Sequence, residues 1–115
     1  MTASIAALGG MAGGTAYTAS KHAVLGFTRV AAAEYAHRNV TVNAVCPGYV
    51  DTDMTTESVS GVAKRSGLDA KAALDAILKT ANQRRLVTPE EVAHVVLSLS
   101  VEESAGVNGQ AIVID

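Results

Sequence analysis

The sequence has few of the residues that mark several functional classes. Of its 115 residues one is cysteine, two are proline, three are tyrosine, one is phenylalanine and none is tryptophan. A single cysteine, Cys46, excludes an internal disulfide and a cysteine-cluster metal site. A chain without disulfides is typical of the reducing cytoplasm, where we expect this protein. So few aromatic side chains argue against a platform that stacks nucleic-acid bases.

Charge and hydropathy exclude further functional classes. Nine Lys and Arg face eleven Asp and Glu, for a net charge of −2, and they form no basic tract. No apolar run approaches the roughly 20 residues of a membrane span, and the start Met1–Ile5 lacks the basic and apolar segments of a secretory signal. With 49% hydrophobic and 17% charged residues, we expect one globular domain with neither a nucleic-acid nor a membrane partner.

The first half of the chain predicts a helix followed by a buried strand. Residues 1–14 are rich in glycine and read as a short extended piece and a loop. Residues 15–38 contain no proline and repeat apolar residues at helical spacing, which predicts a long helix with a broad small-residue face. The β-branched run 40–46 ends at a Pro-Gly pair and predicts a strand buried on both faces, as in parallel sheets. A loop is expected over 49–58 and a helix over 69–81.

The second half predicts one capped helix and one more strand. Thr88 can cap a helix that has Pro89 in its first position, and Glu91 can return a hydrogen bond to the cap. The stripe expected to be buried on this helix follows helical spacing: Val92, Val95, Val96 and Leu99. Residues 111–115 predict a second buried strand. Because helices and strands alternate, the sequence predicts an α/β fold with parallel strands.

Three polar residues near the N-terminus form the candidate catalytic group. Tyr17 and Lys21 are four residues apart and share one face of the predicted helix. An ammonium group beside a phenol favours the phenolate, so such a tyrosine can exchange a proton with an alcohol or carbonyl. The Ser4 hydroxyl could orient the same oxygen. Taken alone, the Tyr-Lys spacing also fits an exposed helical pair.

The motifs together point to a family. They are S-x12-Y-x-x-x-K over 4–21, N-A-V-C-P-G over 43–48, P-G-x-V-x-T over 47–52, R-L-V-x-P-E-E-V-A over 85–93 and V-N-G-Q-A-I-x-I-D over 107–115. Over essentially all 115 residues the chain resembles the C-terminal half of short-chain dehydrogenases/reductases. The resemblance implies a partial Rossmann-like, doubly wound parallel sheet whose N-terminal nucleotide-binding half is missing.

The resemblance also implies an activity and roles for single residues. The cofactor would be NAD or NADP, and the substrate a small secondary alcohol or ketone, most similar to 3-hydroxyacyl compounds. Ser4 would polarise the substrate carbonyl, Tyr17 would be the general acid or base, and Lys21 would favour the phenolate and hold the nicotinamide ribose. Further cofactor contacts would come from four residues: Pro47, Gly48, Val50 (through its backbone) and Thr52 (through its hydroxyl).

Some elements of the family pattern are not in this sequence. The segment LGGMAGG does not fit G-x-G-x-x-G, and it lies between Ser4 and Tyr17 instead of after a first strand. The residue that reads the adenosine ribose and the asparagine of the catalytic tetrad are also missing. We therefore expect a fragment of a protein about twice as long, inactive by itself. Residues 54–82 would be the variable substrate loop, and the helix 15–38 would pair subunits of a homo-oligomer.

Several other residues are expected to have structural roles. His22 is rotated about 100° from Lys21 around the helix axis, so we expect its side chain to be in solvent or to pack against a neighbour. Cys46 should be a half-buried packing residue, and Asp51 and Asp53 should solvate or cap a loop, so no metal site is expected. Four cations could grip an anionic substrate tail but are expected to be solvated: Lys64, Arg65, Arg84 and Arg85.

A second interpretation is a remnant that binds or oligomerises without catalysis. Without further strands beside it, the sheet would leave open edges and apolar faces that invite association. An upstream glycine-rich nucleotide loop would discriminate the two, since its presence favours the enzyme and its absence the remnant.

Overall fold

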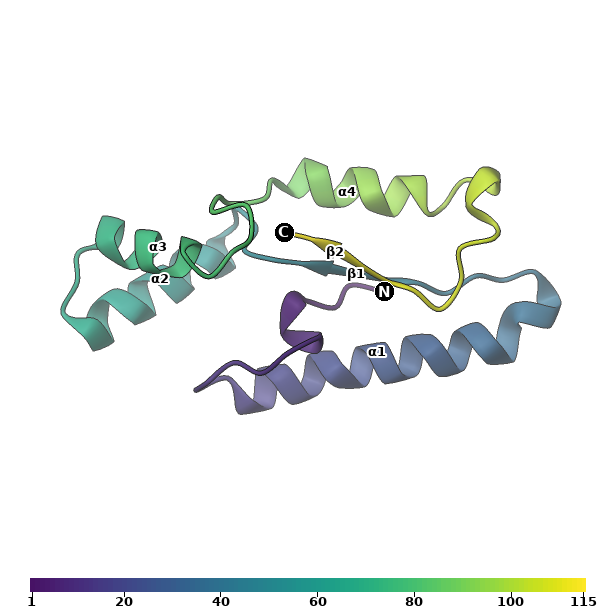
Figure 1. Cartoon of the computed structure of the whole chain (residues 1–115), viewed down its shortest axis with the longest axis horizontal. Coiled ribbons are helices and arrows are strands. Elements are labelled where there is room, and N and C mark those ends of the chain that lie inside the picture. Colours follow the sequence, from purple (N-terminus) through teal and green to yellow (C-terminus); the bar gives the residue numbers. More distant parts are fainter.

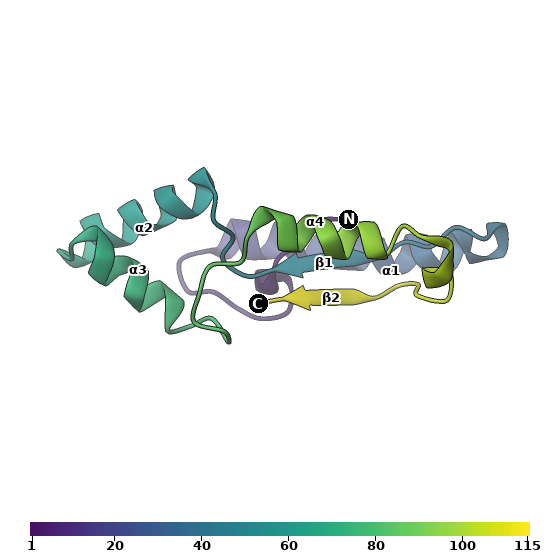
Figure 2. The ribbon, with the colours of Figure 1, turned by 90° about the horizontal axis from the view of Figure 1, so that it is seen from above.

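The computed structural model describes residues 1–115 as two short parallel strands with a helix on each face and a helical hairpin at one end (Figure 1). The helices and strands are α1 (Thr15–Tyr35), β1 (Ala44–Pro47), α2 (Asp53–Ser66), α3 (Ala70–Leu78), α4 (Pro89–Ser98) and β2 (Ala111–Ile114). Short 3₁₀ turns lie at Ile5–Ala7, Ala36–Arg38 and Glu102–Ser104. The molecule measures 54 × 27 × 20 Å, because α2 and α3 extend beyond the sheet (Figure 2).

β1 is the central strand. It pairs in parallel with β2, with Ala44 opposite Ala111 and Pro47 opposite Ile114. On its other edge Val45 bridges Thr2, with hydrogen bonds of 2.8 Å from Ala3 N–H to the Val45 carbonyl and 2.9 Å from Val45 N–H to the Met1 carbonyl. All residues of β1 are buried, which confirms the predicted double-sided burial. The parallel pairing also confirms the α/β class.

β1 begins at Ala44, so the prediction of a strand from residue 40 was wrong at its start. Side-chain amides supply several of the hydrogen bonds there, beside a backbone bond from the Gly109 N–H to the Val42 carbonyl (3.0 Å). Asn108 Oδ1 accepts the Val42 N–H (2.8 Å), while Asn43 donates to the Val107 carbonyl (2.7 Å) and accepts the Gln110 N–H (3.0 Å). Because these amides satisfy the backbone groups, the chain enters the sheet as irregular structure.

α1 confirms the predicted long helix. Its last residues tighten into the 3₁₀ turn Ala36–Arg38, and Asn39 ends it in the left-handed region with φ 57°. The helix buries Leu25, Thr28 and two alanines against the sheet, and it leaves Phe27 and Val30 more than half exposed. The buried face is mostly small, which allows the close packing that the sequence predicts.

The hairpin of α2 and α3 corrects the predicted loop over 49–58, since α2 begins at Asp53. Its residues are mostly polar and threonine-rich, so the helical period was hard to recognise from the sequence. Thr55 contributes to the first turn by donating from its hydroxyl to the Val50 carbonyl (2.5 Å). α3 lies within the predicted range 69–81, and Asp69 caps it by accepting the Ala72 N–H (2.7 Å).

α4 confirms the predicted cap but not the predicted burial. Thr88 and Glu91 form a reciprocal capping box, with Pro89 in the first turn. No residue of α4 is buried, and Val96 is 45% exposed, so the expected stripe is only partly covered. β2 is likewise half-covered, with Val113 50% exposed. Neither element contributes a buried residue, and the buried core is a small cluster from the N-terminal segment, α1 and β1.

Candidate functional site

Ser4 lies where the N-terminal segment leaves the sheet. Its backbone is extended (φ −170°, ψ 161°), and its hydroxyl oxygen accepts the Ala6 N–H (3.2 Å), which caps the turn Ile5–Ala7. The residue is 9% exposed. Because the hydroxyl oxygen is the acceptor in that bond, its hydrogen is available to an external oxygen. The local fold therefore fixes a hydroxyl donor at this edge.

Tyr17 and Lys21 lie on one face of the first turns of α1, as the spacing predicts. The Lys21 Nζ is 5.7 Å from the centre of the Tyr17 ring, a cation–π distance. The ammonium also donates to the Thr2 carbonyl (3.2 Å), which ties α1 to the segment that carries Ser4. The Tyr17 hydroxyl makes no hydrogen bond within the chain, and the residue is 40% exposed. The phenol and the ammonium are thus held together while the phenol oxygen stays free.

The loop Pro47–Thr52, which starts at the last residue of β1, runs from the same end of the sheet as Ser4. Both β1 and β2 point toward the hairpin (Figure 2), and the carboxyl ends of parallel strands are where α/β sheets bind ligands. Gly48 donates to the Ile114 carbonyl (2.8 Å) and lies against Asp115, where any Cβ would collide with the carboxylate. Glycine is favoured here because it leaves room for the Asp115 carboxylate, and not because of its φ angle.

Val50 has an unused backbone donor. The neighbouring amides are engaged, since Asp51 N–H donates to the Val87 carbonyl (2.9 Å) and Val87 N–H donates to the Tyr49 carbonyl (2.8 Å). The Val50 N–H makes no hydrogen bond within the chain, whereas its carbonyl accepts the hydroxyls of Thr55 and, at 3.4 Å, of Thr52. An external carbonyl or amide oxygen can therefore bind at Val50.

The N-terminus of α2 adds a second potential anchor. Thr52 occupies the cap position, but its side chain makes no capping hydrogen bond. The backbone N–H groups of a helix's first turn carry partial positive charge and attract anions. The Thr52 hydroxyl and this helix start are therefore the parts of the loop that suit a phosphate or carboxamide.

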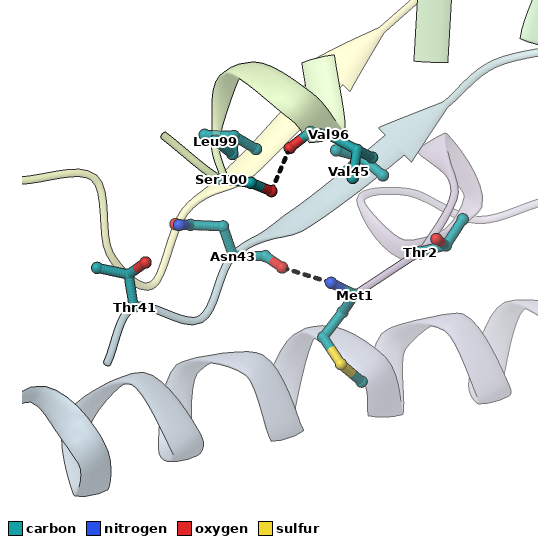
Figure 3. Close-up of a pocket in the computed structure, with 8 residues that line it drawn as sticks. All are labelled: Met1, Thr2, Thr41, Asn43, Val45, Val96, Leu99 and Ser100. Carbon is teal, nitrogen blue, oxygen red and sulfur yellow. Dashed lines mark hydrogen bonds between the residues drawn. The ribbon is translucent and has the colours of Figure 1, made fainter. Parts of the chain in front are cut away.

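Two cavities lie beside the residues described above, and the second of them is lined in part by Asp51 and Thr55. One of about 200 Å³ lies among the N-terminal segment, the start of β1 and the end of α4, where the Met1 ammonium donates to the Asn43 carbonyl (2.8 Å) (Figure 3). The other, of about 390 Å³, lies between α2 and α3 and is lined in part by Val59, Leu74 and Leu86. None of Ser4, Tyr17 and Lys21 lines either cavity.

The remaining candidate residues have structural surroundings. His22 Nδ1 lies 2.9 Å from the Thr18 carbonyl, one turn back along α1. Cys46 is fully buried in the core, which corrects the expected half-burial; burial raises the pKa of its thiol above the usual 9.0, and a hydrogen bond from the Ser4 backbone opposes that shift. Arg85 is not simply solvated, since Glu91 binds it at 2.7 Å. Arg84 takes the left-handed conformation with φ 55°.

Four residues that shape this site were not predicted from the sequence. Thr2 receives the Lys21 ammonium, Thr55 holds the Val50 carbonyl, Val87 pairs with the loop and Asp115 abuts Gly48. Thr2, Val87 and Asp115 contact residues far away in the sequence, which leave no local pattern, whereas Thr55 acts through its hydroxyl within the first turn of α2. No three His, Cys, Asp or Glu side chains converge as a metal site would, and no helix combines the length and apolar character that a membrane span needs.

Comparison with known proteins identifies relatives over nearly the whole chain. An uncharacterized oxidoreductase, YxjF, of Bacillus subtilis is 40% identical over 114 residues, covering 98% of this chain and 44% of the relative. The 3-oxoacyl-[acyl-carrier-protein] reductase FabG of Thermotoga maritima is 41% identical over 112 residues, covering 97% and 41%. The chain thus spans less than half the length of these relatives.

Solved structures share the fold. The F189W variant of actinorhodin polyketide ketoreductase, in complex with NADPH, superposes with a TM-score of 0.92 at 35% identity, over 98% of this chain and 43% of that one. A 4-hydroxyisoleucine dehydrogenase in complex with NADH superposes with a TM-score of 0.83 at 28% identity, over 99% and 43%. The family model described as enoyl-(acyl carrier protein) reductase matches residues 1–115. The chain therefore belongs to the short-chain dehydrogenase/reductase family.

Proposed function

We propose that this chain is the C-terminal, catalytic half of an NAD- or NADP-dependent oxidoreductase that interconverts a secondary alcohol and a ketone. The observation that carries the proposal is the pairing of Tyr17 with Lys21, tied through Thr2 to the Ser4 segment, at the sheet end where the loop Pro47–Thr52 begins. Relatives named as a 3-oxoacyl reductase and a polyketide ketoreductase favour a 3-hydroxyacyl or related substrate.

The residues of the chain fit the nicotinamide half of such a cofactor. The unpaired Val50 N–H suits the carboxamide oxygen, and the Thr52 hydroxyl at the start of α2 suits the carboxamide or a phosphate. Lys21 carries three donors and uses one on Thr2, so two can hold ribose hydroxyls. Gly48 keeps the loop close to β2, and Pro47 ends β1 at this edge. When bound, the dinucleotide supplies the hydride-transfer chemistry.

The side chains of this half would handle the proton. The Tyr17 hydroxyl, free of internal partners, would donate its proton to the carbonyl oxygen in reduction and take it back in oxidation. The Lys21 ammonium, 5.7 Å from the centre of the Tyr17 ring, would place a positive charge beside that phenol. The free hydrogen of the Ser4 hydroxyl would bind the same oxygen and hold it in place. Proton transfer and orientation would thus come from two segments that Lys21 joins.

The remaining parts of the proposal concern the whole protein, meaning the longer polypeptide that we propose contains this chain. Its other half would hold the adenosine and pyrophosphate, and residues 54–82 would cover the substrate and exclude water. We further propose a cytoplasmic homo-oligomer. The exposed Phe27 and Val30 on α1 support association, and they also favour the alternative of a non-catalytic remnant that only binds or oligomerises.

Replacement of Tyr17 by Phe in the whole protein tests the enzyme proposal. We expect turnover of 3-oxoacyl thioesters with NADH or NADPH to fall by about 10²- to 10⁴-fold, because the proton donor is lost. Tyr35→Phe, on the same helix, is the matched control and should leave turnover unchanged. Both variants should melt like the parent. Full turnover in Tyr17→Phe would contradict the mechanism.

The isolated 115-residue chain offers a second test. We expect it to show no ketone-dependent oxidation of NADH or NADPH, because a pyrophosphate-binding loop normally supplies much of the cofactor affinity. Measurable turnover that disappears in Tyr17→Phe would refute this expectation. Absence of turnover in the whole protein as well would favour the remnant.

A further inference from the structure

The loop expected to meet the cofactor is held from one side by the connector that precedes α4. Val87 N–H donates to the Tyr49 carbonyl and Asp51 N–H donates to the Val87 carbonyl, at 2.8 and 2.9 Å. These bonds flank Val50 and leave its own N–H unpaired. Val87 is only 1% exposed, so its side chain anchors the connector in the interior. The position of the free Val50 donor therefore depends on the backbone of Val87.

One ion pair holds the peptide groups on both sides of Val87. The Arg85 Nη1 and Nη2 donate to the two carboxylate oxygens of Glu91, at 2.8 and 2.7 Å. Nη1 also donates to the Leu86 carbonyl (3.0 Å), and Glu91 Oε2 also accepts the Thr88 N–H (2.8 Å). The peptide plane before Val87 and the one after it are thus tied to the same pair of side chains.

This arrangement differs from an ordinary surface ion pair. Lys71 and Asp75 form such a pair on α3, and neither of their charged groups binds the backbone. Exposed pairs of that kind add little to stability. Arg84, the residue just before Arg85, has a left-handed backbone with a φ of 55°, which is unfavourable for a residue with a side chain. A planar guanidinium with fixed donor directions can hold a carboxylate and a carbonyl at once, which a lysine ammonium on a flexible stem does less well.

We propose that Arg85 and Glu91 are positioning residues for the cofactor loop Pro47–Thr52. They fix the backbone of Val87, and Val87 in turn sets where the Val50 N–H points. The role rests on the proposed function, since it assumes that Val50 meets the carboxamide of the dinucleotide. It adds to that function two residues that touch neither substrate nor cofactor and act through the connector.

Amide hydrogen exchange in the whole protein without cofactor tests the first step. In Glu91→Gln we expect the amides of Asp51 and Val87 to exchange about tenfold faster than in the parent, because the connector loosens locally. Arg85→Lys should show a change in the same direction, because the charge remains but the fork is lost. Glu90→Gln is the matched control: it removes the same charge from the same turn of α4, and Glu90 makes no hydrogen bond or ion pair through its side chain. Unchanged exchange in Glu91→Gln would overturn the proposal.

Ligand affinity tests the second step. The affinity for NADH is compared with that for ADP-ribose, and the affinity for NADPH with that for ADP-ribose 2′-phosphate. Each probe lacks only the nicotinamide of its cofactor. In Glu91→Gln the dissociation constant of the reduced dinucleotide should rise about tenfold, as expected when one hydrogen bond is displaced, while that of the ADP-ribose probe changes less than twofold. Equal weakening of both ligands would reveal a merely structural role and overturn the proposal.

The outcomes separate this proposal from the function on which it rests. If the parent binds neither dinucleotide, the proposed function and the positioning role both fail. If the parent binds the dinucleotide and Glu91→Gln binds it equally well, only the positioning role fails.

Discussion

The sheet with α1 and the hairpin of α2 and α3 are supported in different ways. Around β1, a buried cluster and a parallel ladder hold the elements together on both edges of the strand. The hairpin packs mainly against itself, and a cavity of about 390 Å³ opens between its helices. Ser4, Tyr17 and Lys21 belong to the first region, whereas the proposed substrate cover is the second. The proposed proton donor and the proposed substrate cover thus lie in regions that are stabilised separately.

The largest effect should come from the core beside α1. Leu25 is 4% exposed among small residues, so Leu25→Ala should leave a cavity and lower the free energy of unfolding by about 3 kcal/mol. Denaturant unfolding of the whole protein would measure it. Val113→Ala, at a position 50% exposed on β2, should change the same free energy by less than about 0.5 kcal/mol. Equal effects of the two variants would mean that the small cluster is not the core.

A smaller effect is expected in the hairpin. Ile77 is 8% exposed and lies on α3, so Ile77→Ala should cost roughly 2 kcal/mol, mostly as local opening of α2 and α3. Hydrogen exchange should therefore accelerate in the hairpin and stay unchanged in β1. Acceleration throughout the sheet would break the division between the two regions.

Gly48 tests the contact that joins the regions. The Asp115 carboxylate that lies against Gly48 also accepts the backbone and side-chain N–H groups of Asn82, at 3.1 and 2.8 Å. Gly48→Ala should push the carboxylate away and destabilise the fold by about 1 kcal/mol. Combined with Asp115→Ala the two effects should be strongly non-additive in unfolding experiments, because both act on one contact. Additive effects of the two substitutions would contradict the contact between Gly48 and Asp115.

The smallest expected effect is a loss of stability at acid pH. Hydrogen bonds from Arg85 and from the Thr88 backbone lower the pKa of Glu91 from the usual 4.5 to about 2. Its stabilising contribution is therefore complete above pH 4.5 and is lost as the pH falls from 4.5 toward 2. The difference in unfolding free energy between the parent and Glu91→Gln should shrink over that window. A constant difference from pH 6 to pH 2 would contradict the Arg85–Glu91 contact.

Residues with local signals were predictable from the sequence. The helix from Thr15, the capping box at Thr88 and the pairing of Tyr17 with Lys21 follow from spacing and capping chemistry, and the structure confirms each of them. The roles of Ser4, Tyr17 and Lys21 in catalysis stay predictions, as do the cofactor contacts of the loop Pro47–Thr52.

Features that depend on distant residues were not predictable in this way. The late start of β1 depends on amide hydrogen bonds from Asn43 and Asn108 to segments more than 60 residues away. The exposure of Val96 depends on which layers cover α4, and the pairing of Val87 with the loop depends on the chain returning after the hairpin. None of these contacts leaves a periodic or compositional mark.

The bridge between Val50 and Val87 has a consequence for how this fold can vary. The chain departs from the bridge at Val50 and comes back to it at Val87, and hydrogen bonds join the two sites. Closing a loop whose ends are already adjacent depends only weakly on its length. The hairpin between these residues can therefore be exchanged for one of another length or sequence, provided that Thr55, Asn82 and Arg85 keep their contacts with Val50, Asp115 and Glu91.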